Sequence, residues 1–275
     1  MRVRCNTRIR TRPPDRTAVV VKTFLWIVLP YICLTSFVVG HFWRYKYDKF
    51  GWTSRSSELY EKRVLSLASP LFHFGILGVL AGHVVGLLVP EGWTNDIGIS
   101  EHTYHVVAVS LGTVAGAATV VGLLLLIYRR RMTPSVHQVT SIADKAMYPL
   151  LGTVIALGIV NTIGVNLLGL GGHAGGYNYR TSVAVWFREV LMFHPSAAPM
   201  SGAPWSFQLH AILALLLLAA WPFTRLVHVL AAPVGYAFRP YIVYRTRVPL
   251  GASRPPRRGW EGTERRAGAG VRPTR

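Results

Sequence analysis

The sequence predicts an all-α membrane protein, a polytopic bundle of five transmembrane helices with its amino terminus outside and its carboxyl terminus in the cytoplasm. Composition is the first observation behind this class, because 51% of the residues are hydrophobic. The second is a set of long apolar runs, of which residues 67–90 contain no Asp, Glu, Lys or Arg. At about 1.5 Å per residue, such a run crosses the roughly 30 Å hydrocarbon core of a bilayer.

Five apolar stretches are predicted to span the membrane and to form one domain over residues 23–233. They lie at residues 23–43, 67–90, 105–128, 147–170 and 207–233. Basic residues follow the first span as RYKYDK and the third as RRR, whereas the loop after the second has acidic residues and no Lys or Arg. Positive charge collects in cytoplasmic loops. The loops after the first and third spans are therefore predicted to be cytoplasmic, and the loop after the second external.

Three further regions lie outside the spans. Residues 171–206 contain the amphipathic stretch TSVAVWFREVLMF, which is predicted to form an interfacial helix at the outer face. Residues 1–22 form a basic extension that contradicts an external amino terminus. One interpretation is a mis-assigned start, with translation beginning at a valine such as Val20 or Val21. Residues 234–275 are rich in Arg, Gly and Pro and are predicted to form an extended cytoplasmic tail.

The net charge of +19 does not predict nucleic-acid binding, because no recognition module accompanies it. In a membrane protein the same charge fits cytoplasmic loops that dock partner proteins or bind anionic lipid. Cys5 and Cys33 form neither a metal-ligand spacing nor a disulfide framework. Metal chemistry in this chain therefore depends on histidine.

Two of the predicted spans carry two histidines each, and a polar group inside lipid usually marks function. His73 and His83 lie ten residues apart in the second span, and His210 and His228 lie eighteen apart in the fifth. At about 100° per residue, each pair lies on one face of its helix. The two spans run in opposite directions. We therefore expect His73 with His228 at the inner level, and the other two histidines together at the outer level.

Two histidines at each of two levels form the pattern that a dihaem cytochrome b requires, because two axial imidazoles fill the coordination sphere of the iron. In ideal helices the two histidines of the second span would lie about 15 Å apart along the axis and those of the fifth about 27 Å apart. These two distances do not match. A tilt or a kink at Pro222 is expected to absorb the difference. Arg225 is expected either to pair with a haem propionate or to snorkel to the inner headgroups.

Two other classes of function stay open at this point. Four histidines could relay protons in a haem-free transporter, although the chain shows no inverted repeat. A purely structural membrane anchor is the other alternative, and it leaves the paired histidines unexplained.

Three motifs carry a resemblance to a known family. LASPLFHFGILGVLAGH at 67–83, FQLH at 207–210 and PFTRLVH at 222–228 resemble the cytochrome b gamma subunit of membrane-bound respiratory nitrate reductase. The similarity takes in LPYICLTSFVVGHFWRYKYDKFGW in the first span and APVGY after the fifth, so that it covers residues 24–247.

The resemblance implies two b haems. It assigns His73 and His228 as iron ligands of the haem nearer the cytoplasm, and His83 and His210 as iron ligands of the outer haem. It also implies quinol as the substrate, oxidised beside the outer haem.

Three residues are expected at the quinol site. The family's glycine directly before the outer-haem histidine corresponds to Gly82, which would line the pocket. Some members carry a lysine near the start of the third span, where this chain has Tyr104 and His105 instead. Either of these two residues is expected to replace the lysine as proton acceptor.

The resemblance further implies a membrane-anchor subunit in a prokaryotic cell membrane that serves anaerobic nitrate respiration. Electrons would pass to an iron–sulfur beta subunit and then to a molybdenum-containing alpha subunit, which reduces nitrate on the cytoplasmic side. Neither molybdenum nor an iron–sulfur cluster is expected on this chain. The alternative within electron transfer is a dihaem quinone-linked subunit of a sulfur-pathway or heterodisulfide-type complex.

Overall fold

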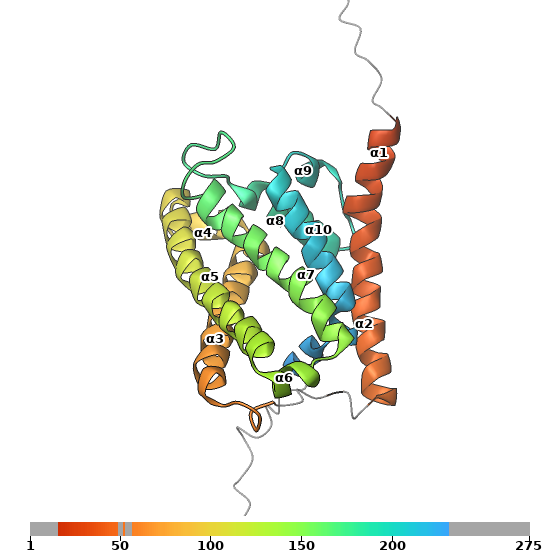
Figure 1. The fold of residues 1–275 in the computed structure, drawn as a ribbon. Helices are drawn as coiled ribbons and strands as arrows, with labels where there is room; N and C mark the ends of the chain where they lie inside the picture. Colours follow the sequence, from red (N-terminus) through yellow and green to blue (C-terminus); the bar gives the residue numbers. More distant parts are fainter. Residues whose placement is uncertain (1–15, 49–51, 53–56, 231–275) are drawn as a thin grey trace, which may run out of the picture. The chain divides into compact units, whose positions relative to one another are not determined.

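The computed structural model describes residues 16–48, 52 and 57–230, and within these residues all regular structure is helical. Five helices are long and apolar enough to cross a membrane, which confirms the predicted five-helix, all-α class (Figure 1). They cover Arg16–Tyr47, Arg63–Leu88, Glu101–Met132, Ile142–Val165 and Trp205–Phe223. The orientation of the bundle across the membrane stays a prediction.

Several crossing helices are composites of shorter elements. In chain order these are α1 (Arg16–Thr23), the π-helical η1 (Phe24–Val28), α2 (Leu29–Tyr47), α3 (Arg63–Leu88), α5 (Glu101–Met132), α7 (Ile142–Ile159), the π-helical η2 (Val160–Val165), α10 (Trp205–Ala220) and the 3-10 helix η4 (Trp221–Phe223). The connections contain α4 (Glu91–Asp96), α6 (Pro134–Gln138), η3 (Tyr179–Thr181), α8 (Val183–Leu191) and α9 (Ala198–Ser201). A last 3-10 helix, η5 (Arg225–Val229), follows η4.

Successive crossing helices run in alternate directions, so the bundle has two ends (Figure 1). We call one the arginine end, where α5 finishes with Arg129 and Arg130 and α7 begins near Asp144. We call the other the α8 end, which holds α4, α8 and α9. α8 is the helix predicted in the amphipathic stretch of residues 171–206, and its position at a membrane surface stays a prediction.

Small residues let α3 and α5 pack closely. A Cβ built on Gly75 would lie 2.6 Å from the backbone nitrogen of Thr119, and one built on Gly78 would lie 3.1 Å from the Cβ of Ala115. α10 packs instead against α2 and α7. In Figure 1, α3 and α5 lie together on the left, and α10 lies beside α2 on the right. Within the described residues, α3 and α10 are therefore not close packing partners.

The fifth span was predicted over residues 207–233, with a tilt or a kink at Pro222, and the structure has a complete break of the α-helix there. α10 ends at Ala220, Pro222 lies in a 3-10 turn, and Thr224 is extended with φ −115° and ψ 177°. Proline explains the break, because it has no N–H to donate and its ring clashes with the preceding helical turn. His228 consequently lies on the separate helix η5. Residues 231–233 lie outside the described residues.

Other boundaries also differ from the predicted ones. The first helix begins at Arg16, so residues 16–22 of the predicted extension are helical. α7 begins five residues before the predicted residue 147, because Ser141 and Asp144 form a capping box at its amino terminus. Residues 1–15 of the predicted extension and the whole predicted tail, 234–275, lie outside the described residues.

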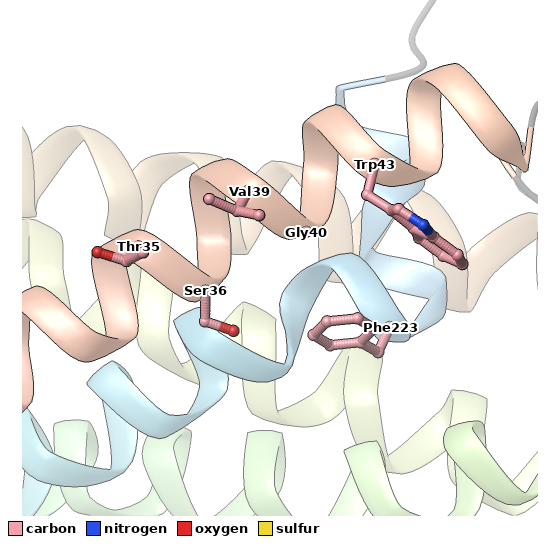
Figure 2. A pocket seen from close by; sticks show the side chains of 6 residues that line it. All are labelled: Thr35, Ser36, Val39, Gly40, Trp43 and Phe223. Carbon is pink, nitrogen blue, oxygen red and sulfur yellow. The ribbon is translucent and has the colours of Figure 1, made fainter.

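Gly40 of α2 allows a close approach of the break at Pro222. A Cβ built on Gly40 would lie 2.6 Å from the Pro222 Cγ, and Arg44 donates a hydrogen bond of 2.6 Å to the Pro222 carbonyl. A mostly apolar groove lies beside this contact, and Figure 2 shows its lining residues Thr35, Ser36, Val39, Gly40, Trp43 and Phe223. These residues include no histidine, so the groove is separate from the candidate site.

Candidate functional site

Two pairs of histidines connect α3 to the last part of the bundle. His73 of α3 faces His228 of η5, with ring centroids 6.0 Å apart. His83 of α3 faces His210 of α10, with ring centroids 6.1 Å apart. The structure thus brings together the residues that the sequence analysis paired. Their role as metal ligands stays a prediction.

All four imidazoles direct the Nδ1 nitrogen at a backbone carbonyl. The Nδ1–O distances are 2.7 Å from His73 to Ser69, 2.8 Å from His83 to Val79, 3.0 Å from His210 to Val154 and 2.5 Å from His228 to Arg225. A carbonyl oxygen only accepts hydrogen bonds, so Nδ1 carries the proton in each neutral ring. The Nε2 lone pair is then available to a metal ion. This is the arrangement that metal-bound histidines adopt.

The separation of the rings fits one metal ion between each pair. Metal–nitrogen bonds of about 2.0–2.1 Å, extended on both sides to the ring centre, require centroids about 6 Å apart. Direct hydrogen bonding between the rings would bring them closer than this. Both pairs therefore have the spacing of bis-histidine coordination.

Two histidines fill only two coordination positions of a metal ion, so other donors must fill the remaining positions. No group of three or more His, Cys, Asp or Glu among the described residues could hold a bare metal ion. Haem needs only two axial ligands from the protein, because the porphyrin supplies the equatorial nitrogens. A Cβ built on Gly82 would meet no atom within 4 Å, so the backbone beside His83 is open to a large group. The histidine pair of each level therefore fits the ligand set of a b-type haem, and Gly82 leaves room for such a group beside His83.

A pair of tyrosines lies between α3 and α10 at the α8 end. The hydroxyl groups of Tyr104 and Tyr179 are 3.2 Å apart. A Cβ built on Gly86, three residues after His83, would lie 2.7 Å from the Tyr179 hydroxyl. The Tyr179 ring also stacks with Phe207, at a centroid distance of 6.4 Å. Tyr179 therefore contacts both helices that carry the outer histidine pair, α3 at Gly86 and α10 at Phe207.

Arg180 supports this tyrosine pair. Its side chain is 1% exposed and donates hydrogen bonds to Glu101 at 3.0 Å and to Thr94 at 2.9 Å. Its guanidinium carbon lies 3.9 Å from the centroid of the Tyr104 ring. Burial, followed by the hydrogen bond with Tyr104, raises the pKa of the Tyr179 phenol above its usual range. The phenol consequently stays protonated, and able to donate a hydrogen bond, at neutral pH.

The predicted quinol-site residues do not all lie together. Gly82 is one helical turn before Gly86 on α3, and Tyr104 belongs to the tyrosine pair that contacts Gly86. His105 lies on the side of α5 that faces the end of η2, where its Nε2 is 3.2 Å from the Asn166 carbonyl. Tyr104 and His105 therefore point to different neighbours.

Buried ion pairs hold the arginine end. Arg129, with 2% of its side chain exposed, binds Glu61 at 2.6 Å. The backbone N–H of Val64, together with Arg129, holds the pKa of the Glu61 carboxyl below its usual range. The Arg225 Nε lies 3.2 Å from the Asp144 carboxylate. Asp144 thus supplies an anion for Arg225, and pairing of Arg225 with a propionate stays a prediction.

Sequence reasoning did not single out Tyr179 or Asp144. Tyr179 lies in an irregular connection, where no helical or strand period predicts its neighbours. Asp144 did carry a local signal, because S-x-x-D before an apolar run predicts a helix start. That signal predicts the cap and not the ion pair with Arg225, which depends on the break at Pro222.

Comparison with known proteins gives a match to the family model described as nitrate reductase gamma subunit, over residues 22–247. The chain is 51% identical over 245 residues to the nitrate reductase-like protein NarX of Mycobacterium tuberculosis, an alignment that covers 89% of this chain and 37% of that protein. It is 44% identical over 223 residues to the nitrate reductase gamma chain of Bacillus subtilis, covering 81% of this chain and 97% of the relative.

The respiratory nitrate reductase 1 gamma chain of Escherichia coli is 33% identical over 225 residues, covering 82% of this chain and 97% of the relative. The chain therefore spans 37% of the length of the NarX relative and nearly the full length of the two gamma chains.

Proposed function

The chain belongs to the nitrate reductase gamma subunit family, and from this membership we propose that it is the membrane-anchor cytochrome b subunit of a respiratory nitrate reductase. In this role it oxidises quinol near the outer face of the membrane and delivers the electrons to a cytoplasmic iron–sulfur subunit. Nitrate is reduced on another chain of the complex.

The observation that carries this proposal is the presence of two facing histidine pairs at two depths of one membrane bundle. His73 and His228 would hold one b haem near the arginine end, and His83 and His210 would hold the other near the α8 end. A bound b haem supplies an iron centre that takes up and releases one electron at a time. Because two histidines would hold each haem, the group would supply electron transfer and not oxygen chemistry.

The α8 end has the polar groups that a quinol pocket needs. The Tyr104 and Tyr179 hydroxyls can form hydrogen bonds with a quinol hydroxyl, and Gly82 leaves room for a flat ring beside His83. Burial raises the pKa of the Tyr179 phenol, so this phenol stays protonated at neutral pH and would position the quinol without accepting its proton. His105 lies apart from the tyrosine pair and directs Nε2 at the Asn166 carbonyl, so that its Nδ1 is the nitrogen that would accept a proton.

The arginine end is the proposed cytoplasmic side. Its exposed cations, with the basic loops predicted from the sequence, suit docking of an iron–sulfur beta subunit or binding of anionic lipid. The beta subunit would pass electrons on to a molybdenum-containing alpha subunit. The protein is accordingly proposed to be a multi-pass protein of a prokaryotic cell membrane.

A haem-free proton relay is less well supported. A relay histidine needs both ring nitrogens for proton exchange, whereas all four Nδ1 atoms here are occupied by backbone carbonyls. Family membership likewise favours nitrate over the sulfur-pathway and heterodisulfide-type complexes.

The test is haem content and turnover of the purified complex. We expect two b-type haems per chain by pyridine haemochrome titration. His83→Ala and His210→Ala should each remove the outer haem and abolish quinol-dependent nitrate reduction, because one imidazole is insufficient to hold the iron. His194→Ala, at an exposed histidine of the same end, is the control and should keep both haems. Full turnover with quinol in either ligand variant would contradict the proposal.

A further inference from the structure

His228 occupies an unusual position for a proposed haem ligand. Its three proposed counterparts lie within long helices, whereas His228 lies on η5, a 3-10 helix of five residues that follows the extended residue Thr224. Short 3-10 helices have weak internal hydrogen bonding. The position of His228 therefore depends on contacts between η5 and the rest of the bundle.

Some of those contacts are local or apolar. The Thr224 hydroxyl accepts a hydrogen bond from the Leu226 N–H at 3.3 Å, and the Trp221 ring donates to the Leu226 carbonyl at 2.8 Å. Val227 is fully buried, and Leu226 packs against a core cluster of Leu123, Leu151 and Leu217. Apolar packing of this kind is non-directional, so it does not fix the rotation of a short helix about its axis.

A directional contact with another helix comes from Arg225. Its Nε lies 3.2 Å from the Oδ1 of Asp144, on α7. The Asp144 side chain is 7% exposed, and Arg130 Nη1 lies 4.0 Å from its other oxygen. Asp144 is itself fixed by the capping box with Ser141 at the start of α7. It is therefore a rigid anion at a helix amino terminus, where negative charge is favoured.

The same arginine also orients the histidine. The Arg225 carbonyl accepts the hydrogen bond from the His228 Nδ1 at 2.5 Å. Anchoring the Arg225 side chain to α7 thus fixes the residue whose carbonyl sets the tautomer and the ring plane of His228. We infer that Asp144 is a positioning residue for His228, acting through Arg225. This inference rests on the proposed function, in which His228 is a haem ligand.

The inference is tested in the assembled complex with Asp144→Asn, Arg225→Gln and Arg225→Lys. The first readout is the rate of haem transfer from each site to an excess of apomyoglobin. Loss of an outer-shell partner of a metal ligand typically costs about 10- to 100-fold in affinity. We expect Asp144→Asn and Arg225→Gln to speed haem loss from the site at the arginine end by about tenfold or more. Arg225→Lys, which keeps the cation, should restore most of the retention.

The second readout is the reduction potential of that haem centre. Asp144→Asn leaves a cation without its carboxylate and should raise the potential, whereas Arg225→Gln leaves the anion and should lower it. General damage to the fold would shift both variants in the same direction. The centre at His83 and His210 is the internal reference. Glu61→Gln is the matched control, because it removes a different ion pair of the arginine end, the one with Arg129.

Failure of the inference differs from failure of the proposed function. Two haems in Asp144→Asn and Arg225→Gln, with unchanged retention and potential at the arginine end, would overturn the positioning role and leave the function intact. Equal changes at both centres would also overturn it. A native complex in which this chain holds no haem would instead overturn the proposed function. If Asp144→Asn does not assemble, Arg225→Gln decides the question, because it leaves the capping box in place.

Discussion

At the scale of single residues, the Tyr179 hydroxyl is expected to form a hydrogen bond with quinol in the proposed pocket. Its hydroxyl lies at Gly86 on α3 and its ring lies against Phe207 before His210. A neutral hydrogen bond contributes about 0.5–1.5 kcal/mol. We therefore expect Tyr179→Phe to raise the KM for quinol by about three- to tenfold in steady-state nitrate reduction, with both haems retained.

Tyr177→Phe is the matched control for this prediction. Tyr177 also contacts Phe207, at 5.2 Å between centroids, but its hydroxyl binds Ser182 at 2.7 Å and not Tyr104. The control should leave the KM near that of the native protein. An unchanged KM in Tyr179→Phe, or an equal rise in both variants, would contradict a direct contact between the Tyr179 hydroxyl and quinol.

At the scale of elements, the seam between α3 and α5 depends on glycine. A Cβ at Gly75 would lie 2.6 Å from the backbone nitrogen of Thr119, which cannot move without moving the helix. Overpacking of this kind costs about 1–3 kcal/mol. We expect Gly75→Ala to lower the Tm of the detergent-solubilised protein by several degrees, since each kcal/mol corresponds to about 2–4 °C in a domain of this size.

Gly92→Ala tests whether the effect belongs to the seam. Gly92 lies in α4, where an added Cβ would meet no atom within 4 Å, and alanine favours helix over glycine by about 1 kcal/mol. The Tm of this control should stay constant or rise. A Gly75→Ala variant as stable as the native protein would mean that α3 and α5 can separate without loss.

Sequence reasoning was most successful where the helical period alone decides the answer. Apolar runs predicted five crossing helices, and the histidine spacing on α3 predicted one shared face, because both depend only on length and on 3.6 residues per turn. The same reasoning expected a tilt or a kink at Pro222, but it did not predict that α10 ends at Ala220 and that the separate helix η5 carries His228. The pairing of His73 with His228 was still predicted correctly, because it depends on the level of the chain and not on the kink.

Tertiary contacts between irregular segments could not be predicted in this way. The position of Tyr179 beside Gly86 depends on the path of the connection after η2, which includes glycines at positive φ such as Gly169 and Gly171. No periodic pattern describes such a path. The ion pair of Asp144 with Arg225 likewise required the break at Pro222 to be known first.

At the scale of the whole molecule, the two ends of the bundle differ in charge. The described residues of the arginine end include Arg129, Arg130 and Lys145, whereas α4 and the start of α5 at the α8 end carry Glu91 and Glu101. Positive loops stay in the cytoplasm. This asymmetry supports the proposed direction of electron flow, from a quinol pocket at the outer α8 end to a partner at the inner arginine end.

The direction is testable by thiol labelling in intact cells. In a background with Cys5 and Cys33 replaced by serine, Gly202→Cys places an exposed thiol at the α8 end and Ser135→Cys places one at the arginine end. We expect a membrane-impermeant maleimide to label the first and not the second, and to label both once the cells are permeabilised. Labelling of Ser135→Cys alone in intact cells would mean that the bundle has the opposite orientation in the membrane. Quinol protons would then be released into the cytoplasm, and the docking surface would lie outside.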